Sequence, residues 1–163
     1  MNVTDAQKGW ERKMQEKHSE EDTINRTCKA FTIRGAFCGD KCFPSLNQYI
    51  AELGRNPRCG AKLKKQYVMI ATNAIRRDLG RYKTTNPVIL HYVFGEPKKG
   101  AKRDFGNVFS LADKFIEDAL RDCRVIPDDN PRFVKNFTHE FLYTDGVPFI
   151  RVEIEEVETP KKL

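Results

Sequence analysis

The stretch between residues 102 and 129 combines residue types that could assemble a metal site acting on phosphate. Carboxylates occupy both of its ends and a lysine lies between them in a helix-like segment; these residues are Asp104, Lys114, Asp128 and Asp129. Mg²⁺ and Mn²⁺ prefer carboxylate oxygens, commonly one or two from the protein, with water and phosphate completing the shell. A metal held by Asp104 and Asp129 or Asp128 would polarise a phosphoryl oxygen and activate water, and Lys114 would stabilise developing negative charge. We therefore expect the helix to fold back so that its start and the segment beyond it share one sheet edge.

Each part of this stretch also has an ordinary structural interpretation, which stays open. The segment 128–131 reads Asp-Asp-Asn-Pro, and these residue types form turns. Lys114 and Asp118 have the i,i+4 spacing of a surface ion pair. A helix over 107–122 would carry a polar stripe along one border of its apolar face, formed by Asn107, Ser110, Lys114 and Asp118. The same helical geometry turns three charged residues towards water, namely Asp113, Glu117 and Arg121.

Periodicity and turn residues predict the elements that must position these side chains. Residues 29–34 alternate apolar and polar side chains, and the apolar run 88–94 is typical of a buried central strand. Ser45 is a suitable N-cap for a helix that ends near Gly54, and a basic turn over 55–60 precedes the next helix. The expected elements are strands at 29–34, 88–94, about 133–143 and about 147–155, and helices at 45–54, 61–79 and 107–122.

The 163 residues favour one domain. We expect a charged N-terminal arm over 1–27 that includes Trp10, a folded domain over 28–157 and a frayed tail over 158–163. No run approaches the ~18 consecutive apolar residues of a membrane span. The first residues lack the apolar core of a secretory signal. The expected location is therefore cytoplasmic, with no membrane segment.

The chain is basic, with 29 Lys and Arg against 23 Asp and Glu, a net charge of +6. Such a balance favours a polyanionic partner, because basic side chains placed on phosphates release condensed counterions. A solvated basic surface is the alternative. The residues expected to contact DNA phosphates are Arg55, Arg58, Lys62, Lys64, Lys65, Lys98, Lys99, Lys102 and Arg103.

Five cysteines, an odd number, argue against a complete disulfide framework and for a reducing compartment. Cys38 and Cys42 form the only close pair, while Cys28 and Cys59 are isolated, and structural zinc usually needs four ligands in two tight pairs. Plain thiols are the favoured interpretation. A small zinc-stabilised interaction module remains an alternative of a different class.

Four short motifs resemble the RusA-like Holliday junction resolvases, in particular those of phages and prophages. They occur in the family's order over about residues 31–155 and are Pro44–Tyr49, Lys102–Asn107, Lys114–Leu120 and Val125–Asp129. The resemblance implies an α+β fold, a small mixed β-sheet with helices packed on it, in a homodimer that cuts branched DNA with Mg²⁺ or Mn²⁺. Matched by position, it implies that Asp104, Asp129 and Asp128 belong to the metal site. It implies that Lys114 is the family's helix lysine.

One position departs from the family signature, in which a second aspartate follows the first after one residue. Gly106 stands there in this chain, which removes a carboxylate and adds backbone freedom at the start of the helix. Three outcomes stay open. The remaining acids hold a metal, Asp118 or another acid substitutes, or the protein binds DNA junctions in recombination and repair without cutting them.

Overall fold

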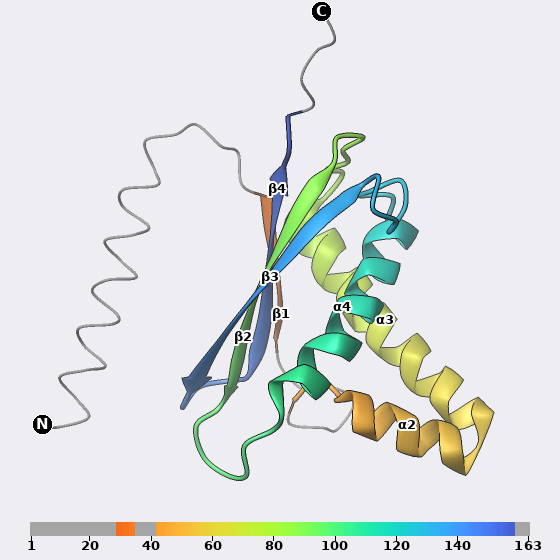
Figure 1. The fold of residues 1–163 in the computed structure, drawn as a ribbon, viewed down its shortest axis with the longest axis vertical. Helices are drawn as coiled ribbons and strands as arrows, with labels where there is room; N and C mark the ends of the chain where they lie inside the picture. The colour runs from red at the N-terminus through yellow and green to blue at the C-terminus, as the bar shows by residue number, and fades with distance from the viewer. Residues whose placement is uncertain (1–28, 35–41, 159–163) are drawn as a thin grey trace, which may run out of the picture.

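A four-stranded sheet carries three helices on one of its faces in the computed structural model, which describes residues 29–34 and 42–158 (Figure 1). The strands are β1 (Lys29–Arg34), β2 (Val88–Pro97), β3 (Val134–Thr144) and β4 (Phe149–Glu156). The helices are α2 (Leu46–Arg55), α3 (Pro57–Leu79) and α4 (Phe105–Asp122). This single α+β domain with a mixed sheet confirms the predicted fold class. The predicted N-terminal arm with Trp10, Cys28, Cys38 and residues 159–163 of the tail lie outside the described residues.

The strand order is β1-β4-β2-β3, and β4 runs antiparallel to both of its neighbours. β2 and β3 are parallel, so α4 is the crossover that connects them. β2 is interior, and its side chains alternate between buried and partly buried, which confirms the predicted central strand. Since a crossover helix must run back along the sheet, α4 starts near the end of β2 and ends near the start of β3 (Figure 1).

Polar caps set the helix starts. Ser45 and Gln48 form a reciprocal capping box at α2, with the Gln48 side chain accepting from the Ser45 N–H at 2.8 Å. Asn56 caps α3, and Pro57 occupies its first turn, where a missing N–H costs nothing. The basic turn predicted over 55–60 is therefore wrong except at Asn56, because α2 includes Arg55 and the cap and proline start α3 four residues earlier than predicted.

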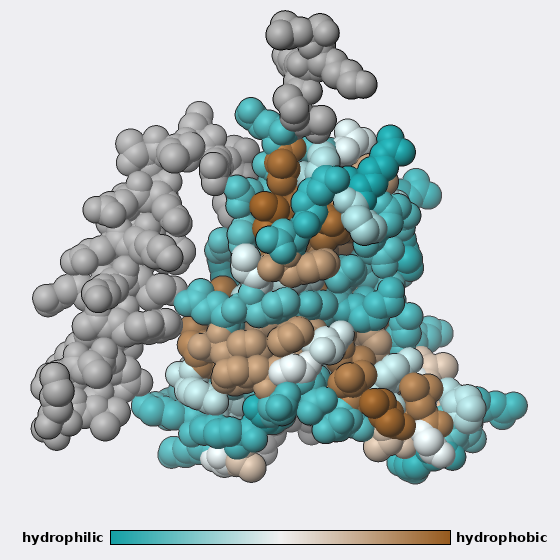
Figure 2. All heavy atoms as spheres, in the orientation of Figure 1, coloured by the Kyte–Doolittle hydropathy of each residue, from teal (hydrophilic) through white to brown (hydrophobic). Residues whose placement is uncertain are grey.

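The core lies between the sheet and the helices, and it includes α3, α4 and all four strands. Its largest fully buried side chains include Tyr67, Tyr92, Phe31, Phe94 and Phe115. The surface shows apolar areas over the middle of the sheet and over α2 between hydrophilic bands (Figure 2). No helix in the described ranges is long and apolar enough to cross a membrane.

The end of α3 is tied to β1 by two charged side chains. Asp78 Oδ2 accepts from the Thr32 N–H at 2.9 Å, and the neighbouring Arg77 donates to the Thr32 carbonyl. The hydrogen bond from Arg77, with further help from Thr32, outweighs partial burial and lowers the pKa of Asp78 to about 2. The ionised carboxylate therefore stabilises the edge strand.

Replacing Asp78 by asparagine is expected to lower the free energy of unfolding at pH 7 by about 1 kcal/mol, because a charge-assisted hydrogen bond is weakened at a partly exposed site. A carboxyl whose pKa is lower in the folded state stabilises above its unfolded pKa. The difference between wild type and variant should therefore shrink as the pH falls from about 4 towards 2. Urea unfolding at several pH values measures it, with Asp122→Asn as the control. A difference independent of pH would contradict the assigned ion pair.

Candidate functional site

The second half of α4 gathers charged side chains from three segments of the chain. Lys114 Nζ lies 3.3 Å from Asp129 Oδ2 and 3.6 Å from Asp118 Oδ1. Arg121 approaches the same two carboxylates, at 3.4 Å from Asp118 and 3.7 Å from Asp129. Lys64 of α3 completes the group at 2.8 Å from Asp118 Oδ2. The α4 cluster, as we call these five residues, joins both helices to the loop after α4.

Asp118 is the buried centre of the α4 cluster, with its side chain only 6% exposed. Three cations surround it, so its charge is compensated although it is removed from water. The sequence suggested only a surface i,i+4 pair between Lys114 and Asp118. Asp118 is buried instead, because α3 packs over the polar border of α4 and supplies Lys64. Lys64, predicted to contact phosphate, is committed to an ion pair between helices.

Asp128 and Asp129 differ in their surroundings. Asp128 accepts from the Asp129 N–H at 2.9 Å and from the Asn130 side chain at 2.6 Å, the pattern of a side-chain-stabilised turn. Burial opposes ionisation of Asp129, but the hydrogen bond and charge of Lys114 outweigh it and hold the pKa of Asp129 below its ordinary value. Asp128 thus shapes the loop, and Asp129 presents an ionised carboxylate to Lys114.

Asp104 lies at the other end of α4, where its side chain accepts from the Asn107 N–H at 3.1 Å and caps the helix. The ten residues from Asp104 to Lys114 rise about 15 Å along the axis. Asp129 contacts both Lys114 and Arg121, so it lies still further along. Two oxygens on one Mg²⁺ lie at most about 4.2 Å apart. The structure therefore does not bring Asp104 and Asp129 together on one ion.

The expectation that the start of α4 and the segment beyond it share a sheet edge is wrong. The parallel pairing of β2 with β3 is the reason, because it requires the connecting helix to traverse the sheet. Asp104 follows the end of β2, whereas Asp129 precedes the start of β3. The two predicted ligands consequently flank opposite ends of the two parallel strands.

Two acids expected to face water lie against the sheet side of α4 instead. Burial and the nearby carboxylates of Asp113 and Asp129 raise the pKa of Glu117 to about 7. Burial likewise raises the pKa of Asp113 to about 6, although His139 of β3 opposes the rise through a 2.7 Å contact. Glu117 and Asp113 thus add two partly buried carboxyl groups beside the α4 cluster, and Asp113 is paired with His139. The partial burial of these acids could have been predicted from the sequence. Phe109 and Leu120 lie close to Asp113 around the helix, so they widen its apolar face towards that residue.

Arg103, predicted to contact phosphate, is instead part of the folded framework. Its guanidinium donates to both carboxylate oxygens of Glu96, at 2.9 and 2.7 Å, and to the Phe43 carbonyl at 2.6 Å. The Arg103 side chain is 24% exposed and that of Glu96 is 9% exposed. This correction follows from the loop after β2, which turns Arg103 inward so that each of its three guanidinium nitrogens donates within the protein.

The other predicted phosphate contacts divide into paired and exposed residues. Lys98 lies 3.3 Å from Asp145, and Arg55 lies 3.2 Å from Glu52. Lys102 donates to the carbonyls of Pro97 and Lys98. The residues that remain exposed without a partner found in the described ranges are Arg58, Lys62, Lys65 and Lys99.

In the parts of the chain that the structure describes, no three His, Cys, Asp or Glu side chains are arranged to hold a metal. Cys42, Cys59 and Cys123 are outside any disulfide. Two carboxylates with water and phosphate suffice for Mg²⁺, however. Asp129 and Glu117 have the hard oxygen donors that suit it. The sequence matches no protein-family model, and no curated protein matches it either.

Proposed function

We propose that the protein is a metal-dependent endonuclease that cuts branched DNA, such as four-way junctions, in recombination and repair. The observation that carries this proposal is the meeting of Lys114 and Asp129 at 3.3 Å beside Glu117, whose pKa is raised to about 7 partly by neighbouring carboxylates. A carboxyl group whose pKa is raised in part by neighbouring carboxylates favours a cation between them, and groups with a shifted pKa concentrate at functional sites. The resemblance of the four motifs to junction resolvases supplies the substrate class.

In this proposal Asp129 and Glu117 hold Mg²⁺ or Mn²⁺, with Asp128 fixing the loop that carries Asp129. Bound there, the metal would supply Lewis acidity at the scissile phosphate. Lys114 donates to Asp129 in the free protein and stabilises the charge on the departing oxygen during cleavage. Exposed cations of α3 position the DNA backbone without reading its sequence. A homodimer would give two such sites related by a twofold axis, as paired symmetric nicks require.

A nicking assay on a synthetic four-way junction tests the proposal. With Mg²⁺ or Mn²⁺ we expect paired nicks in the junction, little cutting of a linear duplex with the same arm sequence, and no cutting in EDTA. Tight junction binding without metal-dependent nicks would contradict the nuclease.

That outcome would support a second candidate, a junction-binding protein of the same fold that does not cut. Gly106 favours it, because the family's second signature aspartate is absent and Asp104 is committed to capping. A Cβ at Gly106 would lie 3.1 Å from Asp104 Oδ1, the oxygen that accepts from the Asn107 N–H, so an aspartate there requires the Asp104 side chain to shift. If the wild type only binds, Gly106→Asp gives a direct test, because cutting regained by that variant would place the metal site beside Asp104, at the opposite end of α4 from Asp129.

The zinc-stabilised interaction module is decided by metal analysis of the purified full chain. Stoichiometric zinc would support it, and a zinc-free folded protein would exclude it. The described cysteines do not converge with a third ligand, and Cys28 and Cys38 lie outside the described residues.

A further inference from the structure

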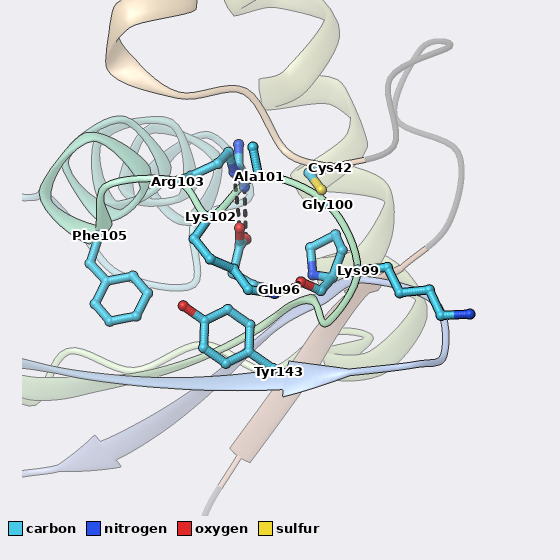
Figure 3. A pocket seen from close by; sticks show the side chains of 10 residues that line it. Cys42, Glu96, Lys99, Gly100, Ala101, Lys102, Arg103, Phe105 and Tyr143 are labelled. Carbon is cyan, nitrogen blue, oxygen red and sulfur yellow. Dashed lines mark hydrogen bonds and ion pairs between the residues drawn. The ribbon is translucent and has the colours of Figure 1, made fainter.

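A pocket of about 240 Å³ lies at the end of β2, between the loop over 97–103 and the start of α4 (Figure 3). Phe105 and Tyr143 form one wall, and Lys99 and Lys102 belong to its lining. It lies at the opposite end of α4 from Asp129. No feature of the proposed nuclease site uses it.

The two aromatic rings are held in place yet remain accessible. Phe105 stacks on Phe141 with ring centroids 3.9 Å apart, and Phe141 stacks in turn on the buried Phe94 at 4.7 Å. Phe105 is nevertheless 41% exposed and Tyr143 is 42% exposed. Their centroids are 6.4 Å apart with the planes tilted by 38°. One face of Phe105 is thus anchored to the core, and the remaining aromatic surface borders the pocket.

The charges around the pocket suit a flanking phosphate. Lys102 Nζ lies 4.3 Å from the centroid of the Tyr143 ring and donates to two carbonyls of the loop, which fixes the loop. Lys99 extends away from the rim, and no partner for it is found in the described ranges (Figure 3). The buried carboxylate in the wall, Glu96, is neutralised by Arg103. The pocket therefore combines π faces with an available cation and without an unpaired buried acid.

We propose that this Phe105–Tyr143 pocket takes one unpaired nucleobase of DNA, with the adjacent phosphate on Lys99. A base has a π face whatever its identity, so stacking on aromatic side chains binds unpaired bases with little sequence preference. Unpairing a base in a stacked duplex costs a few kcal/mol, and the stacking is interrupted at a branch point. The inference rests on the proposed function for its substrate, and it adds a subsite that recognises the branch rather than the scissile phosphate.

The test compares the full-length wild type with Phe105→Leu and Tyr143→Leu, using a four-way junction that carries 2-aminopurine at the branch point. Binding is measured without divalent metal by fluorescence anisotropy, and base unstacking by 2-aminopurine emission. Each variant is expected to weaken junction binding roughly tenfold and to reduce the emission change. Phe105→Tyr, which keeps a ring, should retain both. Phe133→Leu, the same substitution in the turn just before β3, is the matched control.

The outcomes separate this pocket from the nuclease proposal. Thermal unfolding first establishes that each variant is folded, because Phe105 packs on Phe141. Junction binding that is unchanged in both leucine variants would overturn the pocket and leave the nuclease intact. The wild type could also bind a junction and a dT oligonucleotide with equal affinity, and Phe105→Leu could weaken both. That result would support the pocket and contradict a specificity for junctions. No DNA binding by the wild type would overturn both.

Discussion

Replacing Asp129 by asparagine is expected to lower the rate of metal-dependent junction cleavage by about 100-fold or more, because metal catalysis contributes several kcal/mol to transition-state stabilisation. Junction affinity should stay the same or rise, since the substitution removes a negative charge close to phosphate. The variant also removes the negative charge that lies 3.3 Å from Lys114. Single-turnover nicking with Mg²⁺, together with anisotropy in EDTA, measures both quantities on one protein preparation.

Two variants on α4 sharpen this prediction. Asp122→Asn removes an exposed carboxylate from the end of the same helix and should leave cleavage unchanged. Asp104→Ser removes a carboxylate but keeps an N-cap side chain, so it separates capping from metal binding at that position. We expect cleavage to survive Asp104→Ser, because Asp104 lies far along the helix from Asp129. Loss of cleavage there would return Asp104 to the metal site, and loss of junction binding in Asp129→Asn would contradict the assigned role of Asp129.

The elements were predictable because each has a local cause. Residues 29–34 alternate in polarity as an edge strand should, and Ser45 with Gln48 carries the capping signal of α2. The apolar run 88–94 marked the interior strand. Where a prediction failed locally, as at the start of α3, a second cap and a proline had been taken for a turn. Signals of this kind depend only on neighbours within a few residues, so they can be read from a single sequence without knowledge of the fold.

The placement of the site was not predictable in the same way, because it depends on strand pairing. The same segments could bring Asp104 and Asp129 together if the strands before and after α4 were antiparallel and the segment after α4 ran back along the helix. Parallel pairing separates them by most of the helix. The sequence of the helix contains no signal that distinguishes these pairings, since both bury the same apolar face.

Long-range partners were equally hidden. Asp118 has the spacing of a surface pair with Lys114, and only the packing of α3 shows that Lys64 reaches it and that it is buried. Glu117 is polar in the sequence, and its raised pKa arises from acids that the fold brings near it. The sequence shows which residues are basic and where they cluster along the chain. It could not tell which of them already have an acidic partner.

Arg103 provides the largest expected change in stability. Replacing it by methionine keeps most of the side-chain volume but leaves Glu96 buried without its bidentate partner and the Phe43 carbonyl without a donor. Removing one member of such a pair typically costs more than the pair contributes, so we expect the free energy of unfolding to fall by about 3 kcal/mol. Urea unfolding at pH 7 measures the change, and Lys99→Met on the same loop should alter stability by less than about 0.5 kcal/mol.

The double variant Arg103→Met with Glu96→Gln decides whether the loss comes from the stranded carboxylate. Because neutral glutamine costs far less to bury than an unpaired charge, the double variant should recover a large part of the stability lost in the single variant. A double variant no more stable than Arg103→Met would show that the lost packing matters more than the charge. Junction binding of the folded double variant, which leaves no unpaired acid in the wall of the Phe105–Tyr143 pocket, should equal that of the wild type when measured well below its unfolding midpoint. A weakened affinity in that folded protein would mean that Arg103 leaves Glu96 to contact DNA.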